Sequence, residues 1–453
     1  MISIKNGKAS RWSVRGGLFI SQCTKAIVQC NIDPIWSVRF DTTPYPKGPV
    51  AMQRLGQMIR QLARYRRQWE TVMEASSAAS AKFEAPSGPS RLTQAASFGS
   101  NPGNLRMLTY VPESLPSAPA LVVVLHGCTQ TAAGYDHGSG WSALADRYGF
   151  VLLYPEQQES NNPKRCFNWF QLGDIERDRG EAHSIRQMVE HAVRQHGVDR
   201  SRIFVTGLSA GGAMTSTLLA TYPEVFAGGA IIAGLPYRCA TSVPEAFECM
   251  FQGQTRSAEE WGDLVRDASS HVGPWPKVSV WHGSADATVK PINAGEIIKQ
   301  WTNVHGLRVD SSRSDVVDGY PRRTWTDAAG NEIIEEYVIT GMAHGTPLAV
   351  GNDENSYGAP GPFLLDVGIS SSYRIAHFWA LTEPSERTTW SHPAPKSAPH
   401  VSAPALYAHA DTAEASEPEA AARERQPGRQ SASSSPDIGA VITKALRAAG
   451  LMK

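Results

Sequence analysis

The chain has 453 residues, of which 43 are basic and 43 acidic, so its formal net charge at pH 7 is zero. A balanced charge gives no general attraction to a polyanion, and we expect no nucleic-acid partner. No stretch approaches the roughly 18 to 20 uninterrupted apolar residues of a membrane span, so we expect no transmembrane helix.

The N-terminal region divides into three segments that differ in composition. Residues 1–51 show no sustained period, and their start has only a very short apolar run, Leu18 to Ile20, which does not resemble a secretory signal peptide. Residues 52–75 are expected to hold a basic amphipathic helix, because within 52–70 apolar side chains lie near one helical face and arginines mainly elsewhere. Residues 76–99, rich in Ala, Ser, Gly and Pro, are typical of a linker, which can end in an edge strand.

A regular alternation of strands and helices occupies residues 100–383. Leu121–Leu125 is an unbroken apolar run, as expected for a strand buried on both faces. Further strands are predicted at Met107–Val111, Val151–Tyr154, Ile203–Val205, Gly228–Ala233, Val278–Trp281 and Ile333–Ile339. Helices are predicted at Trp141–Tyr148, Glu181–His196, Ala258–His271 and Ala294–Val304, and after the turn at 207–211. This order predicts a mostly parallel α/β sheet with helices on both faces, where ligands collect at the carboxyl ends of the strands.

The composition changes again from about Pro384 to the C-terminus. Residues 384–453 are rich in Pro, Ala, Ser, Glu and Arg and offer too little apolar surface to offset the entropy of ordering. We therefore expect a disordered tail, with one short helix at Ile438–Leu451.

The central motif is Gly207-Leu208-Ser209-Ala210-Gly211, which lies between a predicted strand and a predicted helix. A Gly-x-Ser-x-Gly sequence at such a turn is typical of a nucleophile elbow, where the serine hydroxyl is exposed on a strained backbone. Glycine and serine also occur in ordinary turns, but the strand before and the helix after favour Ser209 as a nucleophile.

A serine nucleophile needs a base, and the base needs a carboxylate to fix its tautomer. In this fold the order along the chain is nucleophile, acid, histidine. Asp286 follows the strand Val278–Trp281, and His344 follows the strand Ile333–Ile339, so both are expected at the same end of the sheet. Other candidates for the acid are Asp310, Asp315 and Asp318, and for the base His282 and His305.

Two backbone N–H groups should stabilise the oxyanion in this type of site. We expect one from Ala210, the residue after the nucleophile, and the other from Cys128, in the loop after the strand Leu121–Leu125. His126 precedes the nucleophile and is expected to brace this loop. Such a mechanism requires no metal and no organic cofactor.

The six cysteines are too few for a disulfide-built scaffold, and no CxxC pair suggests zinc. Two disulfides are compatible with the sequence: Cys128 with Cys166 at the active-site end, and Cys239 with Cys249 in a loop-like segment. The alternative is four reduced thiols, which the absence of a recognisable signal peptide favours.

Seven motifs in this order resemble the polyhydroxybutyrate depolymerase family of α/β-hydrolase esterases, over roughly residues 100–382. They are LHGCTQTAAGYD (125–136), YPEQ (154–157), CFNWF (166–170), GLSAGGAM (207–214), GLPYRCA (234–240), HGSADATV (282–289) and GMAHGTP (341–347). The resemblance implies a serine esterase with Ser209, Asp286 and His344 as catalytic triad, and with the Cys128 N–H in the oxyanion hole. It also implies short-chain polyhydroxyalkanoate, such as poly(3-hydroxybutyrate), as the substrate, with Trp169 near the entrance.

Several alternatives remain open at this stage. The family includes feruloyl and acetylxylan esterase-like members, so the resemblance indicates the reaction better than the substrate. It implies an extracellular enzyme, whereas the N-terminus and the low-complexity tail are compatible with a cytoplasmic one that acts on oligomers, small esters or granules. A different class is a non-catalytic protein that binds polymer granules through the helix at 52–70.

Overall fold

The computed structural model describes residues 90–351 and 353–383, the backbone at 388–389, and helical residues at 60, 61, 63–65, 67, 70 and 71. The extension 1–51, most of the predicted linker and the predicted helix at 438–451 lie outside the described residues. The chain divides into two compact units, 1–71 and 72–453. In the first unit, the described residues within the predicted helix at 52–70 are helical, and Arg60 and Arg64 are exposed.

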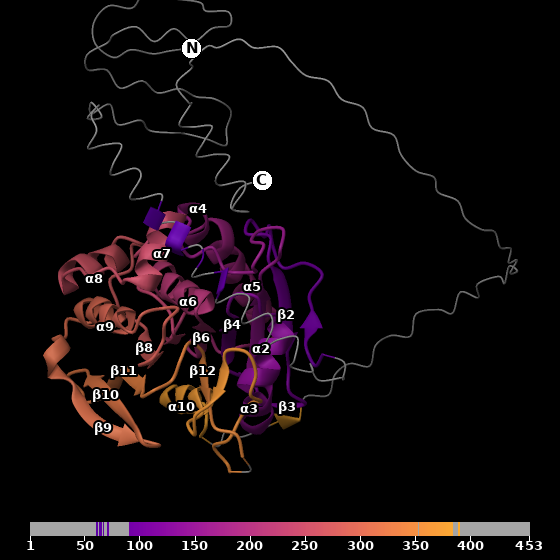
Figure 1. Cartoon of the computed structure of the whole chain (residues 1–453). Helices are drawn as coiled ribbons and strands as arrows, with labels where there is room; N and C mark the ends of the chain where they lie inside the picture. Colours follow the sequence, from indigo (N-terminus) through magenta and orange to yellow (C-terminus); the bar gives the residue numbers. More distant parts are fainter. Residues whose placement is uncertain are drawn as a thin grey trace, which may run out of the picture. The chain divides into compact units, whose positions relative to one another are not determined.

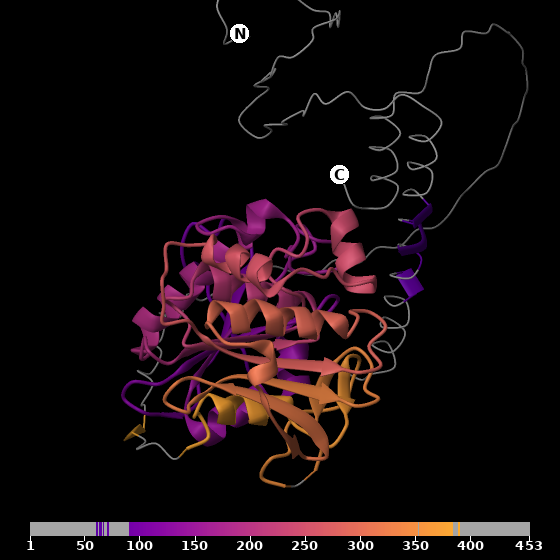
Figure 2. The same ribbon diagram turned by 90° about the vertical axis from the view of Figure 1, so that its left-hand side faces the viewer.

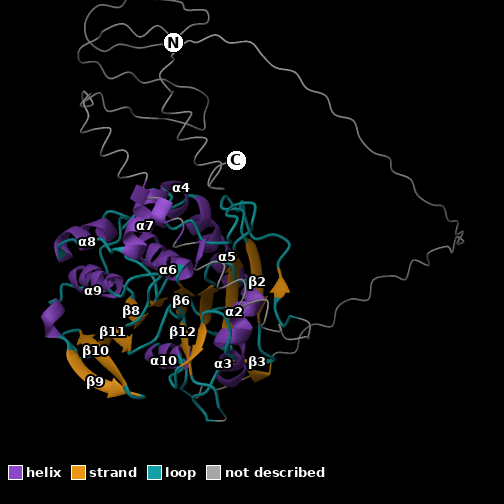
Figure 3. Cartoon of the chain, viewed as in Figure 1, coloured by secondary structure: helices purple, strands orange, loops and turns teal. Residues whose placement is uncertain are grey.

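The second unit is built on a ten-stranded sheet (Figures 1 and 3). Its strand order is β1-β2-β5-β4-β6-β7-β8-β11-β10-β9. The bounds are β1 (Thr93–Gln94), β2 (Arg106–Tyr110), β4 (Leu121–Leu125), β5 (Val151–Glu156), β6 (Ile203–Leu208), β7 (Gly228–Ile232), β8 (Lys277–Gly283), β9 (Arg313–Val317), β10 (Tyr320–Thr326) and β11 (Glu332–Ile339). The strands from β5 to β11 in this order run parallel, and the two strands at either edge are antiparallel, so the predicted mostly parallel sheet is confirmed.

Helices cover both faces of the sheet (Figures 1 and 2). The alternation along β4 explains why: Leu121, Val123 and Leu125 belong to one buried cluster, while Val122 and Val124 belong to the other. The first cluster contains side chains of α5 (Gly180–His196), α6 (Ala210–Thr221), α8 (Ala258–Arg266) and α9 (Ile292–Val304). The second contains side chains of α2 (Ala132–Ser139), α3 (Trp141–Tyr148) and α10 (Ser371–Phe378). Both faces are therefore hydrophobic cores, as the apolar run of β4 predicted.

Smaller elements lie outside the main sheet. Strands β12 (Thr346–Leu348) and β13 (Leu364–Asp366) pair in parallel, and β3 (Ser114–Leu115) pairs with β14 (Thr388–Thr389). The remaining helices are α4 (Leu172–Ile175), α7 (Val243–Phe251) and the 3₁₀ helix η1 (Val309–Ser311). No helix in the described part of the chain is long and apolar enough to cross a membrane.

Two predictions about individual elements were wrong. The helix predicted at Ala258–His271 ends at Arg266, where Asp267 closes the last turn and two turn-favouring serines, Ser269 and Ser270, soon follow. The segment between Cys239 and Cys249, expected to be a loop, contains most of α7. This helix begins with Val243-Pro244, and proline is well suited to a first helical turn.

The two edge strands are both largely exposed but differ in length. Strand β1 has two residues, both exposed, and β9 has five, of which four are exposed. On β9, Val316 is 70% exposed, and Asp315 forms an ion pair with Arg322 of β10. The β9–β10 hairpin thus forms a solvated edge of the sheet, next to the buried parallel strands.

Candidate active site

The parallel strands bring four predicted site residues to the same edge of the sheet. Strands β4, β6, β7, β8 and β11 end in register, and their last paired residues are Leu125 with Gly207, Leu208 with Ile232, Ile232 with Trp281, and Gly283 with Ile339. Cys128 lies just after β4, Ser209 directly after β6, Asp286 after β8 and His344 after β11. The carboxyl edge of the sheet therefore carries the candidate site, as expected for this fold.

Ser209 lies in the turn between β6 and α6, in a strained backbone conformation with φ 58° and ψ −114°. Its N–H donates to the carbonyl of Ile232 at 2.9 Å, and its own carbonyl accepts from the N–H of Ala213 at 2.9 Å. Neighbouring strand and helix thus hold the turn from both sides. No hydrogen bond joins Ser209 Oγ to His344 within the described residues, and in free enzymes such a bond is often long until substrate binds.

The two glycines of the elbow are required by close backbone approach. A Cβ atom on Gly207 would lie 2.5 Å from the carbonyl carbon of Gly211. A Cβ atom on Gly211 would lie 2.4 Å from the carbonyl oxygen of Leu125. Real Cβ atoms do not approach backbone so closely, so only glycine fits at either position.

The predicted acid and base contact each other directly. His344 Nδ1 lies 2.7 Å from Asp286 Oδ2, and both side chains are buried. Burial would raise the pKa of Asp286, but the charge of His344 and the hydrogen bonds from His282 and His344 outweigh it and hold this pKa well below its usual range. Asp286 is therefore a carboxylate near neutral pH, and His344 directs its Nδ1–H to it.

The predicted oxyanion donors come from the first residue of α6 and from the loop after β4. Ala210 is the first residue of α6, and the first helical N–H to donate within this helix is that of Ala213, to the carbonyl of Ser209. The N–H of Ala210 is therefore one of the unpaired donors at a helix N-terminus. Cys128 lies in the loop after β4, where Gly127 N–H donates to Gln130 Oε1 at 2.8 Å and Thr129 N–H donates to Lys164 O at 2.7 Å.

The pairing of these four cysteines matches neither alternative from the sequence, which were two disulfides or four reduced thiols. Cys128 and Cys166 form a disulfide. Cys239 and Cys249 are both buried and free, so the second suggested disulfide is absent. The thiol of Cys249 lies on α7 and donates to the carbonyl oxygen of Cys239 at 2.9 Å instead of meeting its sulfur. Burial raises the pKa of the Cys239 thiol well above its ordinary value, so this group stays protonated near neutral pH.

A buried polar network supports the oxyanion loop, which is the loop after β4 that carries Cys128. His126 Nδ1–H donates to Gly127 O at 2.8 Å, and its Nε2 accepts from the N–H of Gln157 at 3.1 Å. Burial lowers the pKa of His126 to about 4, so it is neutral and serves as a brace, as expected from its position. Glu181 accepts from Gln157 Nε2 at 2.5 Å and from the backbone N–H of Asn168 at 2.8 Å. Glu181 thus holds the segment that carries Cys166.

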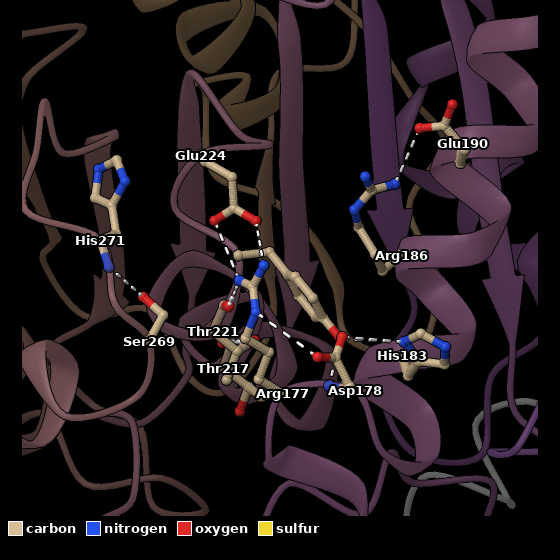
Figure 4. A network of polar contacts seen from close by, with 11 residues as sticks. Arg177, Asp178, His183, Arg186, Glu190, Thr217, Thr221, Glu224, Ser269 and His271 are labelled. Carbon is tan, nitrogen blue, oxygen red and sulfur yellow. Dashed lines mark hydrogen bonds and ion pairs between the residues drawn. The ribbon is translucent and has the colours of Figure 1, made fainter.

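A second polar network fastens the connection between α4 and α5 to the far end of α6 (Figure 4). Arg177 donates to the carbonyl of Thr221 at 2.6 Å and forms an ion pair with Glu224 at 2.7 Å. The N–H of Asp178 donates to the hydroxyl of Tyr222 at 2.8 Å. A cation at the C-terminus of a helix is favoured by the helix dipole, so this contact stabilises the helix that begins after Ser209.

The chain is similar to known esterases. Residues 107–316 match the family described as "Esterase PHB depolymerase". Poly(3-hydroxyalkanoate) depolymerase C of Paucimonas lemoignei is 51% identical over 291 residues, which cover 64% of this chain and 70% of that protein. The chain belongs to the PHB depolymerase family of esterases. This esterase is a serine carboxylic-ester hydrolase with an α/β-hydrolase fold.

Acetylxylan and feruloyl esterases are also related to this PHB depolymerase family member. An acetylxylan esterase of Coprinopsis cinerea is 35% identical, covering 58% of this chain and 71% of that protein. A feruloyl esterase B of Neurospora crassa is 36% identical, covering 56% of this chain and 88% of that protein. The solved structure of acetyl xylan esterase from Aspergillus awamori superposes with a TM-score of 0.55 at 28% identity, covering 64% of this chain and 99% of that one.

The alternative acids and bases of the esterase are engaged elsewhere. Asp310, Asp315 and Asp318 pair with Arg308, Arg322 and Arg374 respectively. His305 Nε2 contacts the carbonyl of Pro276, just before β8 begins, and thus lies toward the amino edge of the sheet. His282, by contrast, contacts Asp286. Within the described residues, no group of three or more His, Cys, Asp or Glu side chains is arranged to hold a metal ion.

Trp169 lies in the segment that the disulfide joins to the oxyanion loop. It is 6% exposed and packs edge-to-face on Phe170, with ring centroids 5.4 Å apart. This segment is supported by Glu181, Gln157 and Asn168, which were not predicted as support from the sequence. No local pattern distinguishes them, because Glu181 lies in the first turn of α5 and meets the other two only in the folded protein.

Proposed function

We propose that this esterase hydrolyses short-chain polyhydroxyalkanoate, such as poly(3-hydroxybutyrate), or its oligomers, through an acyl-enzyme. The observation that supports this substrate is the 51% identity to poly(3-hydroxyalkanoate) depolymerase C over 291 residues. The site lies at the carboxyl edge of a sheet, where this fold places its ligands.

In the proposed reaction Ser209 attacks the ester carbonyl and His344 accepts the hydroxyl proton. His344 directs its Nδ1–H to Asp286 at 2.7 Å, which leaves Nε2 to take the proton. The N–H groups of Cys128 and Ala210 stabilise the oxyanion. His344 then returns the proton to the leaving alcohol, and water releases the acid by the same steps in reverse.

The test compares Ser209→Ala with the wild type on p-nitrophenyl butyrate and on a poly(3-hydroxybutyrate) emulsion. We expect kcat on both substrates to fall by about 10⁶, as for the nucleophile of serine proteases. Ser160→Ala, at an exposed serine, is the matched control and should keep wild-type turnover. Near-normal turnover of Ser209→Ala would contradict the triad, and cleavage of the small ester alone would contradict the polymer substrate.

A second candidate function is that of a feruloyl or acetylxylan esterase. The observation in its favour is that two such enzymes are 35% and 36% identical to this chain. Rates on methyl ferulate, acetylated xylan and hydroxybutyrate oligomers decide between the two functions. A higher kcat/KM on either plant-type substrate than on the oligomers would favour this second candidate.

Trp169 is the proposed substrate-contacting residue near the entrance. An indole is a rigid apolar group, and the small part of Trp169 that is exposed is proposed to contact a polyester chain. In Trp169→Phe we expect KM for hydroxybutyrate oligomers to rise while kcat on p-nitrophenyl butyrate stays close to wild type. Equal KM values in both proteins would remove Trp169 from the binding site.

The helix at 52–70 is the proposed contact with polymer granules. Arg60, Arg64 and Arg67 recur at intervals of four and three residues, so they share one helical face, and all three are exposed. Basic amphipathic helices bind to interfaces through such a face and the apolar face beside it. Cosedimentation with polymer granules, with and without residues 1–90, tests this proposal, and unchanged binding after truncation would refute it.

A further inference from the structure

A second histidine lies against the candidate acid. His282 is a residue of β8 and is 2% exposed. Its Nε2 lies 2.8 Å from the carbonyl oxygen of Val289 and 3.3 Å from Asp286 Oδ2. Asp286 thus contacts two histidines, His282 from β8 and His344 from the connection after β11.

The partners of His282 define which of its nitrogens carries the proton. The carbonyl oxygen of Val289 and the carboxylate of Asp286 are both hydrogen-bond acceptors only. Nε2 of His282 must therefore be the donor. The other nitrogen, Nδ1, is buried and has no partner within the described residues. A proton on Nδ1 would be a buried donor without an acceptor, which is unfavourable. The Nε2–H of His282 is therefore directed to the carbonyl oxygen of Val289 and to Asp286 Oδ2.

This N–H completes the set of donors to the carboxylate of Asp286. Oδ1 accepts from the N–H groups of Thr288 at 2.8 Å and Val289 at 2.9 Å. Oδ2 accepts from His344 at 2.7 Å and faces the His282 N–H at 3.3 Å. The donor from His282 is the longest of the four, and it also ties the Asp286–Val289 turn to the end of β8.

We propose that His282 is a positioning residue for ester hydrolysis, acting through Asp286. Its shared N–H holds the acid turn in place, so that Oδ2 points at His344, and it takes up part of the negative charge of the carboxylate. His282 need not touch substrate or any reacting atom. This inference rests on the proposed triad of Ser209, Asp286 and His344.

The main test compares His282→Leu with His282→Gln. Leucine removes the N–H, whereas the amide of glutamine can place a donor near the position of Nε2. In His282→Leu we expect kcat on p-nitrophenyl butyrate to fall about tenfold with KM unchanged, the effect of one hydrogen bond to a charged group. A carboxylate that has lost a donor attracts the proton on His344 more strongly, so the acid limb of the kcat/KM profile should move to higher pH. His282→Gln should recover most of the lost kcat and the wild-type limb.

Two results would overturn the inference. One is a His282→Leu enzyme with the kcat and the acid limb of the wild type. The other is a His282→Gln enzyme that is as impaired as His282→Leu in both, because a donor at this position would then make no difference. Should His282→Leu not fold, His282→Asn replaces it, since its shorter amide cannot reach both acceptors.

A measurement that does not depend on turnover is the NMR resonance of the proton between His344 and Asp286. It should shift in His282→Leu or His282→Asn and return in His282→Gln, and an identical resonance in all variants would also overturn the inference. Ser209→Ala in the same assay separates the two proposals. If Ser209→Ala is active, the triad itself is wrong; if it is inactive and His282→Leu behaves as wild type, only the role of His282 is wrong.

Discussion

Removal of the Cys128–Cys166 disulfide should lower both stability and turnover. The bridge joins residues 38 apart in the sequence. Loop-closure entropy stabilises a protein by about 3 kcal/mol for a 15-residue loop and about 4.7 kcal/mol for a 100-residue loop, so about 4 kcal/mol is the expected limit here. This is a large part of the roughly 5 to 15 kcal/mol that holds a typical domain folded.

The effect on turnover follows from the place of the bridge. Cys128 supplies one of the two proposed oxyanion donors, and the disulfide ties its loop to the segment held by Glu181. If the loop shifts so that this donor is lost, about 3 kcal/mol of transition-state stabilisation disappears, which is about 10² in kcat. A partial shift costs less, so kcat should fall by up to this factor while KM for a small ester changes little.

The assay is urea unfolding followed by tryptophan fluorescence, together with kcat on p-nitrophenyl butyrate. The double variant Cys128→Ala/Cys166→Ala is compared with Cys239→Ala/Cys249→Ala, in which two buried thiols that form no bridge are replaced. The first should unfold at clearly lower urea and should not respond to a reductant. The wild type and the second variant should both lose stability when reduced.

Two results would contradict the predicted role of the Cys128–Cys166 disulfide. If thiol titration shows all six cysteines reduced in the wild type, and reduction changes neither the urea midpoint nor kcat, then the bridge contributes neither stability nor oxyanion geometry. Equal losses in the two double variants would show that side-chain packing, and not the bridge, is responsible.

Two further predictions concern residues outside the triad. Burial raises the pKa of Glu335 from 4.5 to about 7, so its contribution to stability is fully present below pH 4.5 and is lost as the pH rises through about 7. Between these values the free energy of unfolding of Glu335→Gln should decline less than that of the wild type, and parallel curves in urea would contradict this. Gly211→Ala should unfold at a lower temperature than the wild type, because its Cβ would lie 2.4 Å from Leu125 O. The control is Gly295→Ala, whose Cβ would have nothing within 4 Å, and its free energy of unfolding should rise by up to about 1 kcal/mol. A Gly211→Ala variant as stable as wild type would show that the elbow can shift.

Local patterns were sufficient to predict the central part of the fold. Strand β4 has the predicted bounds, and helix α3 at Trp141–Tyr148 does too, because each forms from residues that are close in sequence. The order of Ser209, Asp286 and His344 after successive strands also predicts that they lie at one edge of the sheet, since parallel strands share their carboxyl ends. Their chemical roles remain a prediction that the proposed variants will test.

The structural features that were not predicted from the sequence escaped prediction for different physical reasons. The β9–β10 hairpin has a recognisable turn, Asp318-Gly319, in which both residues have positive φ, of 50° and 85°. An Asp-Gly pair between apolar residues is a strong hairpin signal, so this element was predictable. That Cys239 and Cys249 stay free was not predictable, because the orientation of Cys249 depends on how α7 packs. The role of Glu181 could not be predicted either, because its partners come together only through tertiary contacts.

The unequal edges of the sheet have a consequence for the proposed activity on a solid polymer, where enzyme molecules would crowd together. Open edges recruit strands from neighbouring molecules, and this tendency grows with local concentration. One edge, β1, is only two residues long, and the other, β9, carries Arg313 and Asp315. Neither offers a long apolar template for another chain. Molecules of this esterase should therefore remain separate and able to exchange when they are packed together at an interface.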